Sequence, residues 1–170
     1  AVKTEERKKI WAWGIKIGRY HIYLPKMLKP KAVSLRISLW RLFYQFAINQ
    51  DIPRSGLNYL IDKKYNKNFL LLCGFEKFKN HYVRIDILEK LFIKILNKTV
   101  NRKFKIDAEM INLIGCNKEG FYSLILSMNY KKGKEKDTYF YSGEGKRKNK
   151  FVNINRDENP FKKLLALNIK

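Results

Sequence analysis

The most informative segment of the chain covers residues 103–130 and reads KFKIDAEMINLIGCNKEGFYSLILSMNY. Its first four residues alternate between lysine and apolar side chains, as a half-buried strand does, and Asp107 then stands at a helix N-cap. A helix through Met110 and Leu113 follows and ends in a turn at residues 115–117. The second helix has apolar residues at the spacing i, i+3, i+4, i+7, namely Phe121, Leu124, Ile125 and Met128.

The flanking residues extend this pattern in both directions. Upstream, Asp86 is expected to cap a helix, and Glu89 completes a capping-box pattern. The apolar stripe of that helix is formed by Leu88, Leu91, Phe92 and Ile95. Downstream, residues 130–132 and 138–141 can pair as strands across the loop 133–137. The order helix, strand, helix, turn, helix, strand, loop, strand predicts a winged-helix-like module.

The first half of the chain predicts a hairpin and a helix. Residues 1–9 are charged and expected to be frayed, after which Trp13, Ile15 and Ile17 alternate like a strand that buries Trp13. A turn at Gly18 and Arg19 would lead into a second strand. A helix over residues 31–48 then has its apolar residues at helical spacing, namely Ala32, Leu35, Leu39, Leu42, Phe43 and Phe46.

These elements predict an α+β fold with four parts. A β-hairpin-plus-helix module covers residues 10–50, and Pro53 and Gly56 mark residues 51–68 as a linker. The winged-helix-like module covers residues 69–142, beginning with two β-rich strands that turn at Lys79 and Asn80. A basic tail, 143–170, is expected to be disordered when free and to end in a short amphipathic turn.

The charge of the chain points to a polyanionic partner. Lys and Arg number 37 against 15 Asp and Glu, which gives a formal net charge of +22. Such an excess is far larger than solubility requires. The candidate RNA-binding residues are four wing lysines, four tail cations, and a pair beside the first hairpin. They are Lys131, Lys132, Lys134, Lys136, Lys146, Arg147, Lys148, Lys150, Arg19 and Tyr20. The alternative for the charged runs is an ordinary solvated surface.

The sequence gives no support for a catalytic or metal site. Cys73 and Cys116 are far apart and lack zinc-site spacing, so a reducing, cytoplasmic setting is expected. His21 and His81 have no partner carboxylate or cysteine at a recognisable spacing, and we expect both to be structural. No apolar run approaches the ~20 residues of a membrane span, and we expect no membrane partner. Because the sequence begins at Ala1 without a methionine, we expect a piece of a larger protein.

Scattered short segments resemble the region that follows the motor core in bacterial Suv-type helicases. The matching segments are GIKIG at 14–18, YLP at 23–25, LKP at 28–30, GF at 74–75, VRIDILE at 83–89, Met110, LIGC at 113–116 and NPF at 159–161. These helicases are relatives of the mitochondrial degradosome RNA helicase. The resemblance implies a superfamily-two, ATP-dependent RNA helicase with ATP and magnesium bound in RecA-like domains upstream. Neither a Walker motif nor a DEAD-like box is present in this sequence.

The working hypothesis is therefore a non-catalytic RNA-binding accessory region with no cofactor of its own. It would hold single-stranded or partly paired RNA for a helicase motor core in cis, in RNA degradation, with a ribonuclease as a possible further partner. The alternative is a structural or interaction module that docks a ribonuclease, the ribosome or the helicase core. A free-standing enzyme is disfavoured because no convergent acid, base, nucleophile or metal set is visible.

Overall fold

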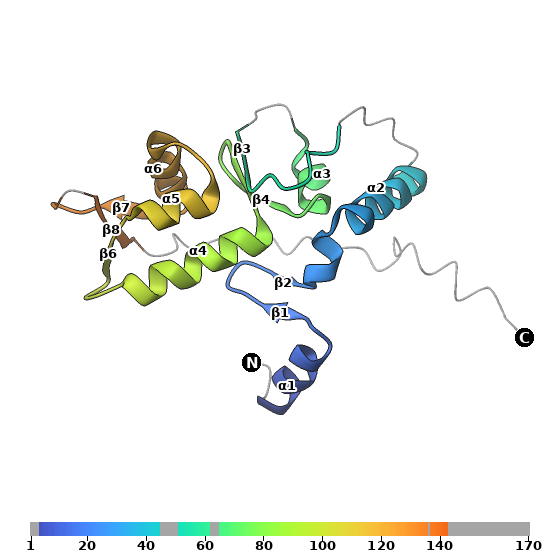
Figure 1. Ribbon diagram of the computed structural model, residues 1–170, viewed down its shortest axis with the longest axis horizontal. Helices are drawn as coiled ribbons and strands as arrows, with labels where there is room; N and C mark the ends of the chain where they lie inside the picture. The colour runs from blue at the N-terminus through green and yellow to red at the C-terminus, as the bar shows by residue number, and fades with distance from the viewer. Residues whose placement is uncertain (1–3, 45–50, 62–64, 136, 143–170) are drawn as a thin grey trace, which may run out of the picture.

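The computed structural model describes residues 4–44, 51–61, 65–135 and 137–142. It has an α+β fold, as predicted, with helices packed against small antiparallel sheets (Figure 1). The helices are α1 (Thr4–Ala12), η1 (Pro25–Leu28), α2 (Pro30–Tyr44), α3 (Lys67–Leu72), α4 (Ile85–Lys98), α5 (Ala108–Ile114) and α6 (Lys118–Ser127). The strands are β1 (Lys16–Ile17), β2 (Ile22–Tyr23), β3 (Tyr59–Ile61), β4 (Phe75–Phe78), β5 (His81–Arg84), β6 (Lys103–Lys105), β7 (Tyr130–Lys132) and β8 (Thr138–Tyr141).

Residues 85–142 follow the predicted order of elements. The three strands form a sheet in the order β6-β8-β7, and α4, α5 and α6 pack beside it. Asp107 caps α5 by accepting a hydrogen bond from the Met110 N–H at 2.8 Å, as predicted. Asn117, which the sequence placed only in a turn, caps α6 through the Gly120 N–H at 2.9 Å. These side chains replace carbonyl partners that the first helical N–H groups lack.

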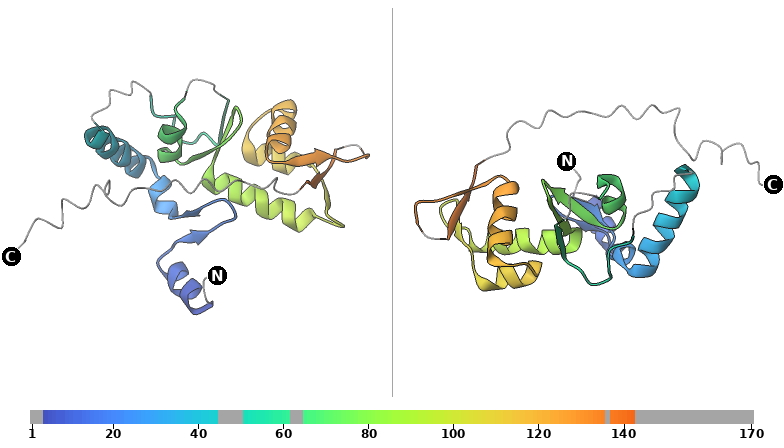
Figure 2. Two further views of the ribbon diagram at one scale, coloured as in Figure 1. Left: turned by 180° about the vertical axis from the view of Figure 1, so that it is seen from behind. Right: turned by 90° about the horizontal axis from the view of Figure 1, so that it is seen from above.

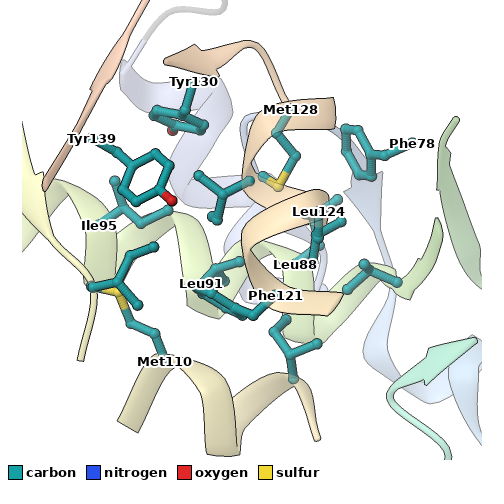
Figure 3. Close-up of a cluster of buried hydrophobic side chains, with 14 of the residues drawn as sticks. Phe78, Leu88, Leu91, Ile95, Met110, Phe121, Leu124, Met128, Tyr130 and Tyr139 are labelled. Carbon is teal, nitrogen blue, oxygen red and sulfur yellow. The ribbon is translucent and has the colours of Figure 1, made fainter. Parts of the chain in front are cut away.

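The main hydrophobic core lies mostly within this part of the chain, and β4 and β5 add Phe78 and Val83 to it (Figure 3). The predicted stripe of α6, residues 121–128, is buried, and α4 and the inner face of the sheet supply its partners. The fully buried side chains include Leu88, Leu91, Met110, Ile114, Phe121, Leu124 and Ile125. Because the buried stripe has helical spacing, the helices of this part of the chain could be predicted from the sequence.

A second, smaller core lies under the sheet β3-β5-β4. The predicted turn at Lys79 and Asn80 joins β4 to β5, and Lys79 has a φ of 53°. Two expectations differ from the structure here. The linker 51–68 contributes β3, which pairs with β5. The expected strand at residue 69 is instead helix α3, capped by Asn66, because a short apolar run does not distinguish a strand from a buried helix.

The N-terminal elements differ most from the prediction. Residues 4–12 form α1 rather than a frayed end, and Trp13 is 72% exposed rather than buried. The hairpin β1-β2 is present but shorter than expected. Helix α2 is described to Tyr44, so the predicted end at residue 48 lies outside the described residues. Figures 1 and 2 show α2 at the end of the molecule opposite the β6-β8-β7 sheet.

The apolar stripe predicted for α2 faces outward. Val33 and Ile37 are the residues of this helix that are buried. Four of the six stripe residues are 54% to 76% exposed, namely Leu35, Leu39, Leu42 and Phe43. Ala32 is half-buried, and Phe46 lies outside the described residues. Sequence periodicity finds an apolar face, but it does not say which face of the helix the rest of the chain covers.

Glu89 has a different role from the capping box that the sequence suggested. Helix α4 begins without a side-chain cap, and the buried Glu89 carboxylate instead accepts the N–H groups of Arg19 (2.8 Å), Tyr20 (2.8 Å) and His21 (3.1 Å). A Cβ on Gly18 would lie 2.1 Å from Glu89 Cδ, so only glycine fits there. The carboxylate therefore fixes the β1-β2 turn to α4.

Candidate nucleic-acid interface

The outer face of the β6-β8-β7 sheet combines lysines with one aromatic ring. The register pairs Phe140 with Lys103 on one side and with Lys131 on the other, and it pairs Lys105 with Thr138. Residues directly opposite each other in an antiparallel sheet point to the same face. Lys103, Lys105, Lys131 and Phe140 therefore share one face, and we call these four residues the outer-face row.

Strand alternation explains why these side chains point away from the core. Phe104 and Tyr139, which precede or follow members of the row, are buried on the opposite face. The three lysines of the row are exposed, whereas Phe140 is half-buried. None of these lysines forms an ion pair with another residue in the described ranges. Their charge is therefore available to an anionic ligand.

The wing next to this face carries further cations. Lys132 ends β7, and Lys134 lies in the loop that leads to β8; both are exposed. The loop is held closed by a hydrogen bond from the Gly133 N–H to the Thr138 carbonyl oxygen at 2.7 Å. The structure thus brings together three of the four predicted wing lysines, Lys131, Lys132 and Lys134. The fourth, Lys136, and the tail residues Lys146, Arg147, Lys148 and Lys150 lie outside the described residues.

The exposed face of α6 is engaged by its own neighbours. The Tyr122 hydroxyl donates a hydrogen bond to Asp137 of the wing at 2.5 Å, and Lys118 Nζ lies 3.9 Å from the same carboxylate. Ser123 Oγ is 2.9 Å from His81 Nε2. A helix that reads base edges in a groove must present its polar side chains outward. On α6 these polar side chains instead form contacts within the chain.

The predicted pair Arg19 and Tyr20 does not join the outer-face row. The Tyr20 ring packs edge-on against Phe78 and Phe92, at centroid distances of 5.5 Å and 6.1 Å. Burial raises the pKa of its hydroxyl well above the usual range. Tyr20 therefore contributes to packing beside the main core, and its ring lies apart from the outer-face row. The Arg19 guanidinium lies over the rings of Phe92 (4.9 Å) and Tyr141 (5.3 Å), on the inner side of the sheet.

A second group of lysines, on α4, is neutralised within the chain. Lys94 Nζ lies 2.6 Å from the Glu109 carboxylate, and Lys98 forms an ion pair with Asp107. Both acidic partners stand at the start of α5. Lys94 and Lys98 have the same chemistry as the lysines of the outer-face row, but among the described residues they have ionic partners and the row lysines do not.

His81 links the β3-β5-β4 sheet, which we call the middle sheet, to α6. Its Nδ1 lies 2.6 Å from the Tyr59 hydroxyl, and its Nε2 contacts Ser123. Burial, together with the nearby charge of Lys79, lowers the pKa of His81, and burial raises the pKa of Tyr59 to about 12. At neutral pH the imidazole is therefore uncharged and the phenol protonated. His21 has a carboxylate partner 55 residues away in the chain, because Glu76 Oε2 lies 2.6 Å from its Nε2.

The thiols are held in their protonated form. Burial raises the pKa of both Cys73 and Cys116 to about 11, so neither is a ready nucleophile at neutral pH. Within the described ranges, no three His, Cys, Asp or Glu side chains gather in a way that would hold a metal ion. In the same part of the chain, every helix falls short of the length and apolar character needed to cross a membrane.

Comparison with known proteins adds no relative. The chain matches no protein-family model, and no curated protein or solved structure is significantly similar to it.

Sequence reasoning missed the residues that complete the outer-face row. Lys103 and Lys105 were recognised as strand residues but were not counted as candidate ligands, and Phe140 was treated only as a strand former. The signal was the alternation of lysine with Phe104 and Ile106, which places both lysines on the solvent side. Their proximity to Lys131 depends on the strand order, which the sequence does not state.

Proposed function

We propose that this chain is a non-catalytic accessory region that binds single-stranded or partly paired RNA. The observation that carries the proposal is the outer-face row, where Phe140 lies between two lysines that have no described ionic partner. Lysines bound to phosphates release condensed counterions, and an aromatic ring stacks on an unpaired base. The exposed wing residues Lys132, at the end of β7, and Lys134, in the following loop, add positive charge beside the row.

The geometry favours a single strand over a specific duplex. The order of elements and the β6-β8-β7 sheet support the interpretation as a winged-helix-like module, in which the helix at the position of α6 commonly enters a DNA groove. Here Tyr122 and Ser123 are bound within the chain, and α6 has Lys118 beside Glu119 at its start. The lysines of the outer-face row lie on the sheet instead, and the half-buried Phe140 ring beside them suits an unstacked base.

The resemblance to Suv-type helicases supplies the biological setting of the proposal. In that setting the chain holds RNA for a motor core upstream, in the cytoplasm, during RNA degradation, and a ribonuclease is a further partner. ATP and magnesium would be bound by the motor core. The residues of this chain would bind and orient the strand without taking part in hydrolysis.

The proposal is tested by the salt dependence of RNA binding. Fluorescence anisotropy would be measured with a labelled single-stranded RNA over a salt series, for the full chain and for a variant with Lys103→Gln, Lys105→Gln and Lys131→Gln. Each lost phosphate contact should flatten the slope of log K against log salt by about 0.7. A variant with Lys90→Gln, Lys94→Gln and Lys98→Gln is the matched control, because it removes the same charge from α4.

We expect the sheet variant to lose affinity and slope while the α4 variant retains most of both. Equal losses in the two variants would mean that net charge alone, and no built surface, attracts the RNA. Absence of binding at low salt in the unmodified chain would refute the RNA function.

A second candidate function, protein docking, is favoured by the exposed stripe of α2. Leu35, Leu39, Leu42 and Phe43 form an apolar row at helical spacing on a helix whose opposite side is packed. Contiguous exposed apolar side chains of this kind mark interaction surfaces. Under this alternative the helicase core, a ribonuclease or the ribosome covers α2, and the lysine variants of the sheet leave that contact unchanged.

A further inference from the structure

A pocket of about 500 Å³ lies between α4, the inner end of the β6-β8-β7 sheet and the β1-β2 turn. It is distinct from the outer-face row, because Tyr130 and Tyr141 are paired on the inner side of the sheet. Its volume falls in the range of small-molecule sites. The side chains that matter for its chemistry are Arg19, Phe92, Leu96, Arg102, Tyr130 and Tyr141.

Most of the pocket lining is apolar and much of it is aromatic. Tyr130 is buried, and its ring lies 5.3 Å from that of Tyr141, centroid to centroid. Tyr141 and Leu96 line the pocket and are 36% and 53% exposed, so both have apolar surface that a ligand can cover. An aromatic ring and an aliphatic side chain facing the same opening suit a planar ligand, since stacking needs only a π-face.

Two guanidinium groups add positive charge to these apolar walls. Arg19 lies over the Phe92 and Tyr141 rings, and Arg102 contributes from the turn before β6, where it is exposed. Arginine binds phosphate with a planar fork of donors and also stacks on flat rings. The pocket therefore offers stacking surface and two anion-binding groups within one cavity.

We propose that this pocket binds one unpaired nucleotide, with the base against Tyr141 and Leu96 and the phosphate held by Arg19 and Arg102. The inference rests on the proposed RNA function and extends it from a charged face to a built subsite. The ligand chemistry is a purine or pyrimidine ring that carries a phosphate, and an RNA strand is its source.

The pocket and the outer-face row are connected through neighbouring residues. Arg102 precedes Lys103 of the row, and Tyr141 follows Phe140 of the row. Because successive residues of β8, Phe140 and Tyr141, point to opposite faces, the two sites lie on opposite sides of the same end of the sheet. A strand bound along the row can therefore turn around this end and insert its next base.

The test uses the fluorescent base 2-aminopurine, which is quenched when it stacks on an aromatic ring. Two ligands are compared with the full chain: a single-stranded RNA with one internal 2-aminopurine, and free 2-aminopurine riboside monophosphate. The variants are Tyr141→Leu, which removes the ring, and Arg102→Gln, which removes one guanidinium. Tyr44→Leu, at the far end of α2 and also exposed, is the matched control.

We expect the unmodified chain and Tyr44→Leu to reduce the 2-aminopurine fluorescence of the RNA severalfold. The reduction caused by Tyr141→Leu should be at least fivefold smaller. Arg102→Gln should weaken affinity severalfold while the remaining bound fraction still shows quenching. Thermal unfolding of each variant confirms that it is folded.

The outcomes separate this inference from the proposed function. One outcome is that RNA binds by anisotropy and is quenched equally by the unmodified chain and by Tyr141→Leu. This would overturn the nucleotide site and leave the proposed RNA binding intact. The pocket would then bind another ligand, such as an acidic peptide. If RNA does not bind at all, the proposed function fails. The free nucleotide then decides for the pocket: quenching lost in Tyr141→Leu supports a nucleotide site with a free-nucleotide source, and no quenching overturns it.

Discussion

The burial of apolar side chains differs between residues 85–142 and residues 4–44. The first region buries the stripes of α4 and α6 in one shared core and exposes its lysines. The second buries Val33 and Ile37 and leaves Trp13 and the α2 stripe exposed. The contrast shows that the first region buries its apolar stripes, with Phe78 and Val83 of the β3-β5-β4 sheet added to its core, whereas the second leaves much of its apolar surface exposed. RNA contact and protein contact are therefore expected in different parts of the chain.

The largest difference between the regions should appear in stability. Leu124→Ala in α6 removes a fully buried side chain and should cost about 2–5 kcal/mol of unfolding free energy, through lost burial and a residual cavity. Leu42→Ala in α2 changes a side chain that is 76% exposed and should cost less than about 0.5 kcal/mol. Urea denaturation of both variants gives the comparison.

A large effect of Leu42→Ala would contradict the exposure of the α2 stripe. If Leu42→Ala were as destabilising as Leu124→Ala, the α2 stripe would be covered in solution, by a second copy of the chain or by another part of it. Repeating the denaturation at several protein concentrations distinguishes these two cases, because a contact between copies depends on concentration.

The two regions meet at Glu89, and a substitution there should have an intermediate effect. Glu89→Gln retains the shape but replaces a carboxylate that accepts three N–H groups by an amide with one acceptor oxygen. Hydrogen bonds to charged groups contribute about 2 kcal/mol, and the loss should be of this order. Amide hydrogen exchange at Arg19, Tyr20 and His21 should accelerate before that of the α6 core.

Glu109→Gln serves as the control, because Glu109 is exposed and belongs to the α4-α5 ion pair. It should leave exchange in the β1-β2 turn unchanged. Unchanged exchange in Glu89→Gln itself would show that other contacts, such as His21 with Glu76, hold the hairpin in place.

The same contrast explains how much of the molecule could be read from its sequence. Elements of residues 85–142 were predictable because the stripe of α6 and the cap Asp107 are local signals that agree with the final packing. The hairpin turn at Lys79 and Asn80 was readable for the same reason. The antiparallel α+β class followed from these elements.

The remaining features depend on contacts between distant residues. Glu89 had the spacing of a capping residue, but a turn 70 positions away in the chain, at Arg19, takes its carboxylate. The apolar face of α2 was visible, while its exposure depends on what packs beside it. Lys103 and Lys131 become neighbours of Phe140 only through the order β6-β8-β7. The pocket between Arg19 and Tyr141 is assembled in the same non-local way.

The smallest predicted effect concerns His81, which connects the β3-β5-β4 sheet to helix α6. Its pKa in the folded chain is lowered from the ordinary value of 6.5, with burial as the main cause and the charge of Lys79 as the second. As the pH falls below 6.5, the unfolded chain therefore takes up this proton before the folded chain does. Stability that is fully present above pH 6.5 should decrease as the pH falls through the folded-state pKa, and then change no further from this group.

Unfolding free energies measured between pH 7.5 and pH 4.5 check this direction. The His81→Asn variant, which removes the imidazole, should show a shallower decrease over that interval than the unmodified chain. His21→Asn removes the other imidazole and should retain the part of the decrease that His81 causes. Because His81 contacts Ser123 of α6 as well as Tyr59 of β3, its protonation should loosen the joint between the middle sheet and α6. An equal pH dependence in the unmodified chain and His81→Asn would mean that this joint tolerates the charge and that the imidazole is better solvated than its burial indicates.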